Sequence, residues 1–323
     1  MKTSMDFETI AKKSKRKQLW KTVSLSIIGA LALGVVIAKG MTELTSYHGN
    51  RIKDDYLLRS QIAYPNVQYK SWYFNPTSTT TGNFTSDRFK NINGITVPYE
   101  TYEANYSMWR NGDTTEADWI FQETDGSPAY TMKENYKSPM FYNTNFRSEG
   151  KNHKVAKEID IAKDMQGQAI EVAITFDKPY TYKELAKKLP KNLMLNWLWI
   201  GTSSNFDVST LPPSDQLGLF ANNSLSQEDL NFFSTNLNKA IKDGMFAKTY
   251  GTTTEGKSSY HFNLETDAKD YLKNNQDIDK ATFSGAILTG RAENFAQLAS
   301  EDWIFASSIG QSVTIQPYHQ LSK

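Results

Sequence analysis

The chain has 323 residues, of which 39% are hydrophobic and 22% are charged, and its net charge is +1. This composition excludes a disordered or collagen-like chain and leaves room for one large or two small domains. The balanced charge also argues against nucleic-acid binding by the protein as a whole. Because the chain has no cysteine, disulfides and Cys-ligated zinc or iron–sulfur sites are excluded. The chain is therefore unlike the disulfide-dense secreted domains and fits the exterior of a bacterial cell better.

The most apolar stretch is Thr22 to Ala38, seventeen residues without a charge between Lys21 and Lys39. As a helix it would be about 25 Å long, slightly short for a hydrocarbon core of about 30 Å unless the two lysines snorkel to the interfaces. Its apolar side chains surround the whole helix, which disfavours a buried core helix with one polar face. The sequence therefore predicts a transmembrane helix over 22–38.

The charges on the two sides of this stretch predict its orientation. Seven basic residues precede it, whereas the seventeen residues that follow carry three basic and three acidic side chains. By the positive-inside rule, residues 1–21 stay in the cytoplasm and residues 39–323 lie outside the cell membrane as part of a single-pass protein. A cleaved signal peptide is the alternative, since Ala30, Ala32 and Ala38 offer small residues for a cleavage site. The long basic region and the long apolar run favour an uncleaved anchor.

The cytoplasmic tail is the candidate contact site. Asp6 to Lys21 can form a helix with Phe7 and Ile10 on one face and basic residues elsewhere. A basic cluster beside a membrane is also attracted to anionic lipid, by about 1 kcal/mol per residue, and that is the simpler interpretation. The candidate partner-binding residues are Phe7, Ile10, Lys12, Lys13, Lys15, Arg16 and Lys17.

Beyond the span, Met41 to Gln61 predicts a stalk helix that is broken at Gly49-Asn50 and followed by Pro65. From Asn66 to about Arg147, short runs of strand-forming residues alternate with polar turn clusters. This pattern predicts antiparallel β structure with exposed loops.

The C-terminal part, 166–323, has a more regular pattern. Gln168 to Phe176 alternates apolar with small or polar residues and predicts a half-buried strand, with Glu171 among the polar positions. Thr181 and Glu184 form a capping box that begins a short helix, which ends at Pro190. A tryptophan-containing strand, LMLNWLWIGT, follows.

The same order of strand, short helix and strand returns near the C-terminus, in the segments ATFSGAILTG, AENFAQLA and WIFASSIG. Two further helices are predicted between the two repeats, over 226–241 and 267–272. The chain is therefore predicted to be α+β, with a transmembrane helix, a β-rich region and a C-terminal domain of two β-α-β units. The predicted divisions are 1–21 (basic tail), 22–38 (span), 39–165 (stalk and β-rich region) and 166–323 (C-terminal domain).

No residue pattern predicts an enzyme, a cofactor or a metal site. The nucleophile-elbow, zinc-protease, phosphate-loop, dinucleotide and calcium-loop motifs are all missing from the sequence. The pairs Asp160/Asp164 and Asp277/Asp279 have spacings that are common on solvated surfaces. The histidines are far apart, without a second histidine at i+3 or i+4, and are His48, His153, His261 and His319.

The aromatic residues, 13% of the chain, allow two interpretations. They could line a glycan or peptide groove, or they could pack in a core. Trp197 and Trp199 alternate on one face of a predicted strand, which favours the core.

Three segments carry a resemblance to a known family: FETIAKKSKRKQLWKTVSLSIIGALALG at 7–34, TFDKPYTYKELAKKLPKNLMLNWLWIGT at 175–202 and FSGAILTGRAENFAQLASEDWIFASSIG at 283–310. In this order around one span they resemble the sigma-factor regulator proteins of Gram-positive bacteria, which are membrane anti-sigma factors. The resemblance implies that the chain holds an extracytoplasmic-function sigma factor at the membrane and releases it under envelope stress.

The chain departs from this family in one respect, since only about twenty residues precede the span, whereas better-known members carry a longer cytoplasmic segment. Such a tail is at or below the roughly 20–30 residues that a standard interface uses on each side. A second membrane protein could supply the remaining surface. An envelope structural or binding module without a signalling role is the alternative function, and an anchored hydrolase is disfavoured by the missing motifs.

Overall fold

The computed structural model describes residues 3–114, 119–121, 128, 130–133, 136–146, 154–209, 211–246, 249–250, 254–255, 258–259 and 262–323. The chain divides into two compact units. The first contains Met1–Ile52, Phe74–Phe84 and Ala104–Asp113, and the second contains Lys53–Tyr73, Thr85–Glu103 and Thr114–Lys323.

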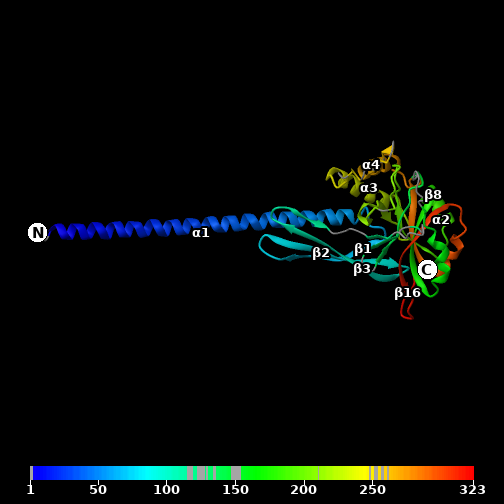
Figure 1. Ribbon diagram of the computed structural model, residues 1–323, viewed down its shortest axis with the longest axis horizontal. Coiled ribbons are helices and arrows are strands. Elements are labelled where there is room, and N and C mark those ends of the chain that lie inside the picture. The colour runs from blue at the N-terminus through cyan, green and yellow to red at the C-terminus, as the bar shows by residue number, and fades with distance from the viewer. Residues whose placement is uncertain are drawn as a thin grey trace. The chain divides into compact units, whose positions relative to one another are not determined.

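One unbroken helix, α1 (Thr3–Arg59), contains the predicted tail helix, the apolar stretch and the stalk (Figure 1). It is long and apolar enough to cross a membrane, and its apolar window is not buried by the rest of the protein. This N-terminal apolar helix is consistent with a membrane anchor.

The predicted break of the stalk at Gly49-Asn50 is wrong, because α1 continues through both residues. A Cβ atom on Gly49 would lie 3.1 Å from the ring of Tyr106 and 3.4 Å from that of Phe74. The glycine therefore lets two aromatic rings approach the helix backbone closely, and this packing supports a helical conformation that glycine alone disfavours by about 1 kcal/mol.

The β-rich region that follows is confirmed. A four-stranded sheet has the order β1-β2-β3-β4, with β1 at Val67–Pro76, β2 at Thr81–Ile92, β3 at Ile95–Ser107 and β4 at Asn111–Thr114. Asn93 and Gly94 connect β2 to β3 with positive φ angles of 52° and 92°, which a tight hairpin turn requires. A second, antiparallel sheet contains β5 (Trp119–Phe121), β6 (Tyr130–Lys133) and β7 (Tyr136–Ser138).

A five-stranded sheet forms the centre of the second unit, in the order β10-β9-β15-β8-β16 with antiparallel neighbours. Its strands are β8 (Gln168–Thr181), β9 (Met194–Trp199), β10 (Gly218–Phe220), β15 (Thr282–Arg291) and β16 (Ile304–Thr314). Helix α2 (Tyr182–Lys188) connects β8 to β9, and the 3₁₀ helix η3 (Ala292–Leu298) connects β15 to β16. Because β15 lies between β8 and β9, and β8 lies between β15 and β16, the two strands that α2 connects are not hydrogen-bonded to each other, and neither are the two that η3 connects.

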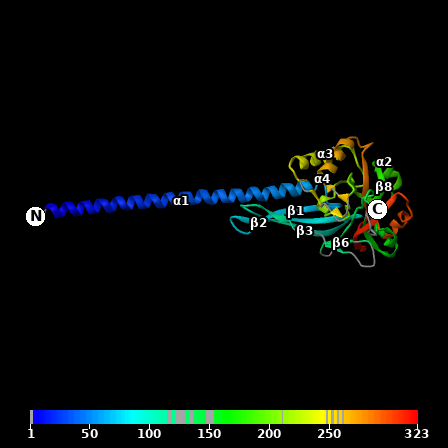
Figure 2. The ribbon, with the colours of Figure 1, turned by 45° about the horizontal axis from the view of Figure 1, so that its top comes forward.

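Two helices lie between β10 and β15 in the sequence, α3 (Gln227–Lys242) and α4 (Leu264–Asn274), and they pack against each other (Figures 1 and 2). The rings of Phe233 and Tyr271 meet edge to face, 6.0 Å apart. The capping box of Thr181 and Glu184 is present as predicted, and Ser226 caps α3. The remaining short elements are η1 (Glu158–Asp164), η2 (Pro213–Asp215), β11 (Thr249–Tyr250), β12 (Thr254–Glu255), β13 (Ser258–Ser259) and β14 (Phe262–Asn263).

The α+β class is confirmed, but the prediction that the strand at 168–176 is only half-buried is wrong. Every residue from Ala169 to Phe176 in β8 is buried, including Glu171 and Thr175. A strand with both neighbours paired and both faces covered must satisfy its polar side chains inside the protein.

Trp199 belongs to this core. Its side chain is 5% exposed and stacks on Phe141, with ring centroids 5.0 Å apart and an angle of 17° between the planes. Stacked aromatic rings add to the free energy that burial alone provides. The structure therefore supports core packing for this tryptophan.

We expect Trp199→Ala to lower the free energy of unfolding by about 3–5 kcal/mol, because it leaves a cavity beside Phe141. Urea unfolding of the full-length protein in detergent, followed by circular dichroism, measures this loss. Phe232→Ala is the control, since Phe232 is 56% exposed on α3 and its loss should change stability by no more than about 0.5 kcal/mol. Equal midpoints for the wild type and Trp199→Ala would contradict the core assignment.

Candidate functional site

The predicted contact residues all lie on the first turns of α1. Phe7 and Ile10 are 79% and 65% exposed, and their three-residue spacing places them on one face of the helix. The basic residues 12–17 are exposed as well, and Lys12 forms an ion pair of 3.4 Å with Glu8. An exposed ion pair of this kind contributes little to stability. The structure thus presents these side chains at the surface, and their binding to a partner stays a prediction.

The other end of α1 is held firmly. Arg59, in the last turn, donates from Nη1 to Asp215 Oδ1 (3.0 Å) and to the carbonyl of Ser214 (2.8 Å), and from Nη2 to the carbonyl of Met245 (3.3 Å). The planar guanidinium group suits several directed hydrogen bonds at once. Arg59 therefore ties the end of α1 to η2 and to the segment after α3.

The backbone after α1 continues this connection. The N–H of Tyr64 donates to the carbonyl of Pro213 (3.0 Å), and the carbonyl of Ile62 accepts from Gly218 at the start of β10 (2.9 Å). The chain that leaves the helix thus joins the edge of the five-stranded sheet.

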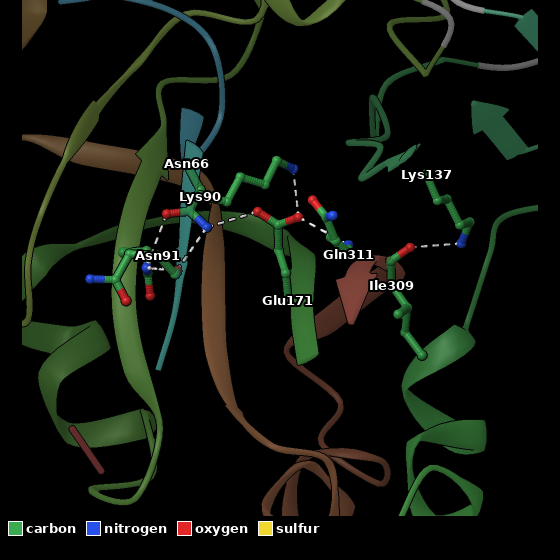
Figure 3. Close-up of polar contacts among 8 residues, drawn as sticks. Asn66, Lys90, Asn91, Lys137, Glu171, Ile309 and Gln311 are labelled. Carbon is green, nitrogen blue, oxygen red and sulfur yellow. Dashed lines mark hydrogen bonds and ion pairs between the residues drawn. The ribbon is translucent and has the colours of Figure 1, made fainter. Parts of the chain in front are cut away.

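A buried ion pair lies at the centre of the second unit (Figure 3). Lys90, from β2, donates from Nζ to Glu171 Oε2 at 2.6 Å, and the two side chains are 1% and 0% exposed. The ammonium group also lies 4.9 Å from the ring centroid of Tyr99. A charge this deep is tolerated only when it is paired and hydrogen-bonded.

Two asparagines complete the carboxylate's surroundings. Asn66 donates from Nδ2 to Glu171 Oε1 (2.8 Å), and its own Oδ1 accepts from Asn196 Nδ2 (3.0 Å). Asn196 Oδ1 accepts from the hydroxyl of Thr289 (2.8 Å), and both asparagines donate to the carbonyl of Asn91. This chain of bonds connects β2 with β8, β9 and β15, and we call these residues, with Lys90 and Glu171, the Glu171 network.

Strand β16 supplies a backbone donor to the same carboxylate. The N–H of Gln311 donates to Glu171 Oε2 (3.2 Å), and a Cβ on the neighbouring Gly310 would lie 2.3 Å from that oxygen, so a glycine is needed there. Nearby, Lys137 donates to the carbonyl of Ile309 (2.7 Å; Figure 3). Lys137 also forms an ion pair with Glu158. Because every oxygen of Glu171 is held by donors of the protein itself, the network is suited to holding strands together and not to binding a ligand.

Sequence reasoning missed the Glu171 network. The alternation in β8 placed Glu171 on a solvent face, and nothing in the chain links it to Lys90, 81 residues earlier. The one available signal was a glutamate within a run that is otherwise entirely apolar or small. A charged residue in such a strand indicates a partner from elsewhere in the fold.

We expect Glu171→Gln to destabilise the protein by about 3–5 kcal/mol, because it leaves the ammonium group of Lys90 buried without its counter-charge. Lys90→Met combined with Glu171→Gln should cost much less than the sum of the two single changes, since neither charge remains. Urea unfolding of the four proteins measures the coupling. Asp243→Ala, which removes an exposed pair on α3, is the control and should cost less than about 1 kcal/mol. Additive single changes would show that the pair carries no coupling energy.

A second buried carboxylate organises the loop after β9. Asp267, at the start of α4 and 6% exposed, accepts from the hydroxyl groups of Thr202 (2.5 Å) and Ser203 (2.7 Å) and from the N–H of Ser203 (2.9 Å). Burial raises the pKa of the Asp267 carboxyl, more than its hydrogen bonds to Thr202 and Ser203 lower it, and the charge of Asp270 raises it further. Ser203 therefore has an aspartate beside it, but this aspartate serves to fix the loop.

The raised pKa of Asp267 predicts a pH dependence of stability. The folded protein holds this proton more tightly than the unfolded chain does, so the carboxyl contributes stability at low pH that is lost as the pH rises from the unfolded pKa, about 3.9, through the folded pKa. We expect the free energy of unfolding of the wild type, minus that of Asp267→Asn, to fall over this interval and then level off. Urea titrations at a series of pH values measure it. A difference that rises with pH would contradict the assigned direction.

The described residues include no group of three or more metal-binding side chains, and His48 and His319 lie far apart in the sequence. His319 accepts from the N–H of Gln316 (3.0 Å), which is a structural role. The other two histidines, His153 and His261, fall outside the described residues.

A cavity of about 210 Å³ in the second unit has Trp199 in its wall with Tyr142, Asp177 and Lys178, among other residues. The one hydroxyl among its described lining residues that is bonded to a carboxylate in the contacts given above is that of Thr202, and its partner Asp267 is the aspartate that fixes the loop after β9.

Comparison with known proteins gives two family matches. Residues 8–97 match the model described as sigma factor regulator N-terminal, and residues 162–311 match sigma factor regulator C-terminal. Together they cover most of the chain, including both ends of the Glu171 network, since Lys90 lies in the first match and Glu171 in the second. No curated protein and no solved structure matches the chain.

Proposed function

This chain belongs to the sigma factor regulator family, and from that premise we propose that it is a single-pass membrane protein that restrains an extracytoplasmic-function sigma factor. Membership implies an anti-sigma-factor-like regulator with a sigma factor as its partner, and regulators of this kind are not enzymes. The proposal adds that the tail acts in the cytoplasm and that the outer domain responds to the cell envelope.

The continuity of α1 is the observation that carries this proposal. One helix contains the exposed tail residues Phe7 and Ile10, the apolar stretch and the last turn, which Arg59 fastens to η2. A continuous helix transmits a shift or rotation along its axis, whereas a broken stalk would absorb it. A change in the outer domain can therefore reach the tail without an intermediate element.

The orientation rests on the excess of basic residues before the span and on the side chains at its two edges. Trp20 and Lys21 stand at one end and Lys39 at the other, where interfacial anchors belong. We infer that residues 1–21 are cytoplasmic, 22–38 span the cell membrane, and 39–165 and 166–323 form the extracellular part. Within 166–323 we regard the two segments joined by α2 and η3 as two β-α-β units, which the antiparallel five-stranded sheet supports.

We propose in addition that a second membrane protein contributes to the interface with the sigma factor. The basic residues would in addition attract anionic lipid, by about 1 kcal/mol each. In this arrangement the apolar residues Phe7 and Ile10 give affinity, whereas the exposed charges mainly change the encounter rate.

We expect Phe7→Ala with Ile10→Ala to raise transcription from promoters of the target sigma factor as strongly as deletion of residues 2–17, because the double change removes the apolar contact and keeps every charge. A transcriptional reporter in the native host measures this effect, and affinity capture from membranes shows whether the sigma factor still accompanies the protein. The control is the replacement by glutamine of Lys12, Lys13, Lys15, Arg16 and Lys17, which keeps both apolar side chains.

A reporter that stays silent in the double variant but rises after neutralisation of the basic residues would assign the tail to electrostatic attachment to lipid. If neither change nor the deletion alters any sigma-dependent promoter, the regulatory proposal fails. A membrane-anchored envelope module without a signalling role would then take its place.

A further inference from the structure

The first unit consists of α1 up to Ile52 and two hairpin ends, 74–84 and 104–113. We propose that these hairpin ends rest on the outer surface of the membrane and that Trp109 anchors them in the interfacial layer of the bilayer. The inference depends on the proposed function in one respect, namely that the apolar part of α1 spans the membrane. The partner that we propose for the hairpin ends is a lipid surface.

The face of α1 that the protein covers begins just beyond the apolar stretch. All residues from Thr22 to Gly40 are exposed, whereas Met41 is half-buried and Thr45 and Gly49 are buried. Their four-residue spacing places these three on one face of the helix. Thr45 lies about 9 Å beyond Lys39 along the axis, close to the roughly 5–7 Å thickness of the headgroup layer on each side of a bilayer. The packing of the unit on α1 therefore starts at the height of the lipid headgroups.

Strand β3 approaches the span as it proceeds. The ring of Tyr102 lies 4.3 Å from that of Tyr56 on α1, and four residues later the ring of Tyr106 lies 3.1 Å from the Cβ position of Gly49. The end of β3 from residue 104 on belongs to the first unit, and from the contact with Gly49 it continues beside α1 toward the N-terminal end of the helix (Figure 2). Figure 2 shows the hairpin ends of β1, β2 and β3 beside α1.

The tip of this hairpin reaches the headgroup layer. The N–H of Ser107 donates to the carbonyl of Arg110 (3.0 Å), which closes a tight turn with Met108 and Trp109 at its end. Trp109 is three residues past Tyr106, and because the last two of these residues lie in the turn it is about 7–10 Å nearer the span, while Gly49 is about 15 Å beyond Lys39. The backbone of Trp109 thus lies about 5–8 Å above the end of the apolar stretch, a distance that an indole side chain can bridge.

The side chains at the tip suit a lipid surface. Trp109 is 81% exposed and stands beside the exposed Arg110. An indole ring combines an apolar body with an N–H donor and prefers the membrane interface, and a guanidinium group binds phosphate. The neighbouring tip, 77–81, is polar and is tied to the first by a bond from the N–H of Met108 to the carbonyl of Thr80 (2.9 Å). A polar tip with one projecting tryptophan fits a shallow interfacial anchor.

Because the chain has no cysteine, single spin labels can test this arrangement in the full-length protein. Trp109→Cys, Ala30→Cys in the span and the exposed Asn50→Cys on α1 are labelled and reconstituted into phosphatidylcholine vesicles that contain phosphatidylglycerol. We expect the label at 30 to be accessible to oxygen and the label at 50 to be accessible to a water-soluble nickel chelate. The label at 109 should show an accessibility to each reagent that is intermediate between those of the other two labels. A label at 109 that is as accessible to the chelate as that at 50, with 30 still in lipid, overturns the inference. A water-accessible label at 30 would instead contradict the proposed span.

A second measurement keeps the tryptophan in place. A label at Thr79→Cys, on the adjacent tip, should gain accessibility to the chelate when Trp109→Ser is added, because the tips then lose their anchor. Trp72→Ser is the matched control, since Trp72 is 40% exposed on β1 and lies about 16 Å along the strand from that tip. No gain with Trp109→Ser, or an equal gain with Trp72→Ser, would show that Trp109 does not hold the tips at the bilayer. A label at 109 that is immobilised yet shielded from both reagents would indicate a protein surface as the occupant and would also overturn the inference.

Discussion

The fold of the second unit depends on one buried charge pair. Glu171 lies in a strand with neighbours on both sides, so its carboxylate has no route to water, and Lys90 must bring the opposite charge into the interior. The other carboxylate oxygen accepts from Asn66, which precedes β1, and the N–H of Gln311 in β16 donates to the oxygen that Lys90 also holds. A buried charge pair is a weak source of stability compared with apolar packing, but it strongly penalises any arrangement that separates its members. This pair therefore fixes how β2 meets the five-stranded sheet.

This penalty has a consequence for regulation. The C-terminal residues are bonded to the β2–β3 turn as well, since Lys323 and Asn93 exchange two hydrogen bonds, 2.9 and 3.0 Å long. Hydrogen bonds therefore join residues 90–93, the five-stranded sheet and the C-terminus of the described chain, and Arg59 bonds the last turn of α1 to η2. The same helix carries the tail residues that the proposed function assigns to the sigma factor.

A parallel constraint operates on α1 at Gly49. The glycine suggested a helix break when only the sequence was considered, because glycine is a poor helix former in isolation. In the structure its missing side chain admits the rings of Tyr106 and Phe74, and this tertiary packing keeps the helix continuous. Because the helix is continuous, it contains the exposed tail residues, the apolar stretch and the face on which the hairpin ends pack.

The sequence alone determined the features that depend on short-range physics. The apolar stretch, the charge asymmetry, the capping boxes and the alternating strands all follow from side chains within about one or two turns of each other. The sequence also determined the family, because the matching segments are contiguous stretches of residues. The tertiary structure alone decided that Glu171 and Lys90 are buried and paired. The two residues are separated by 81 positions in the sequence and become partners only when two sheets meet. It likewise decided that Arg59 is an attachment point and that Gly49 is a contact, because the need for a charge partner or for empty space arises from groups that are distant along the chain.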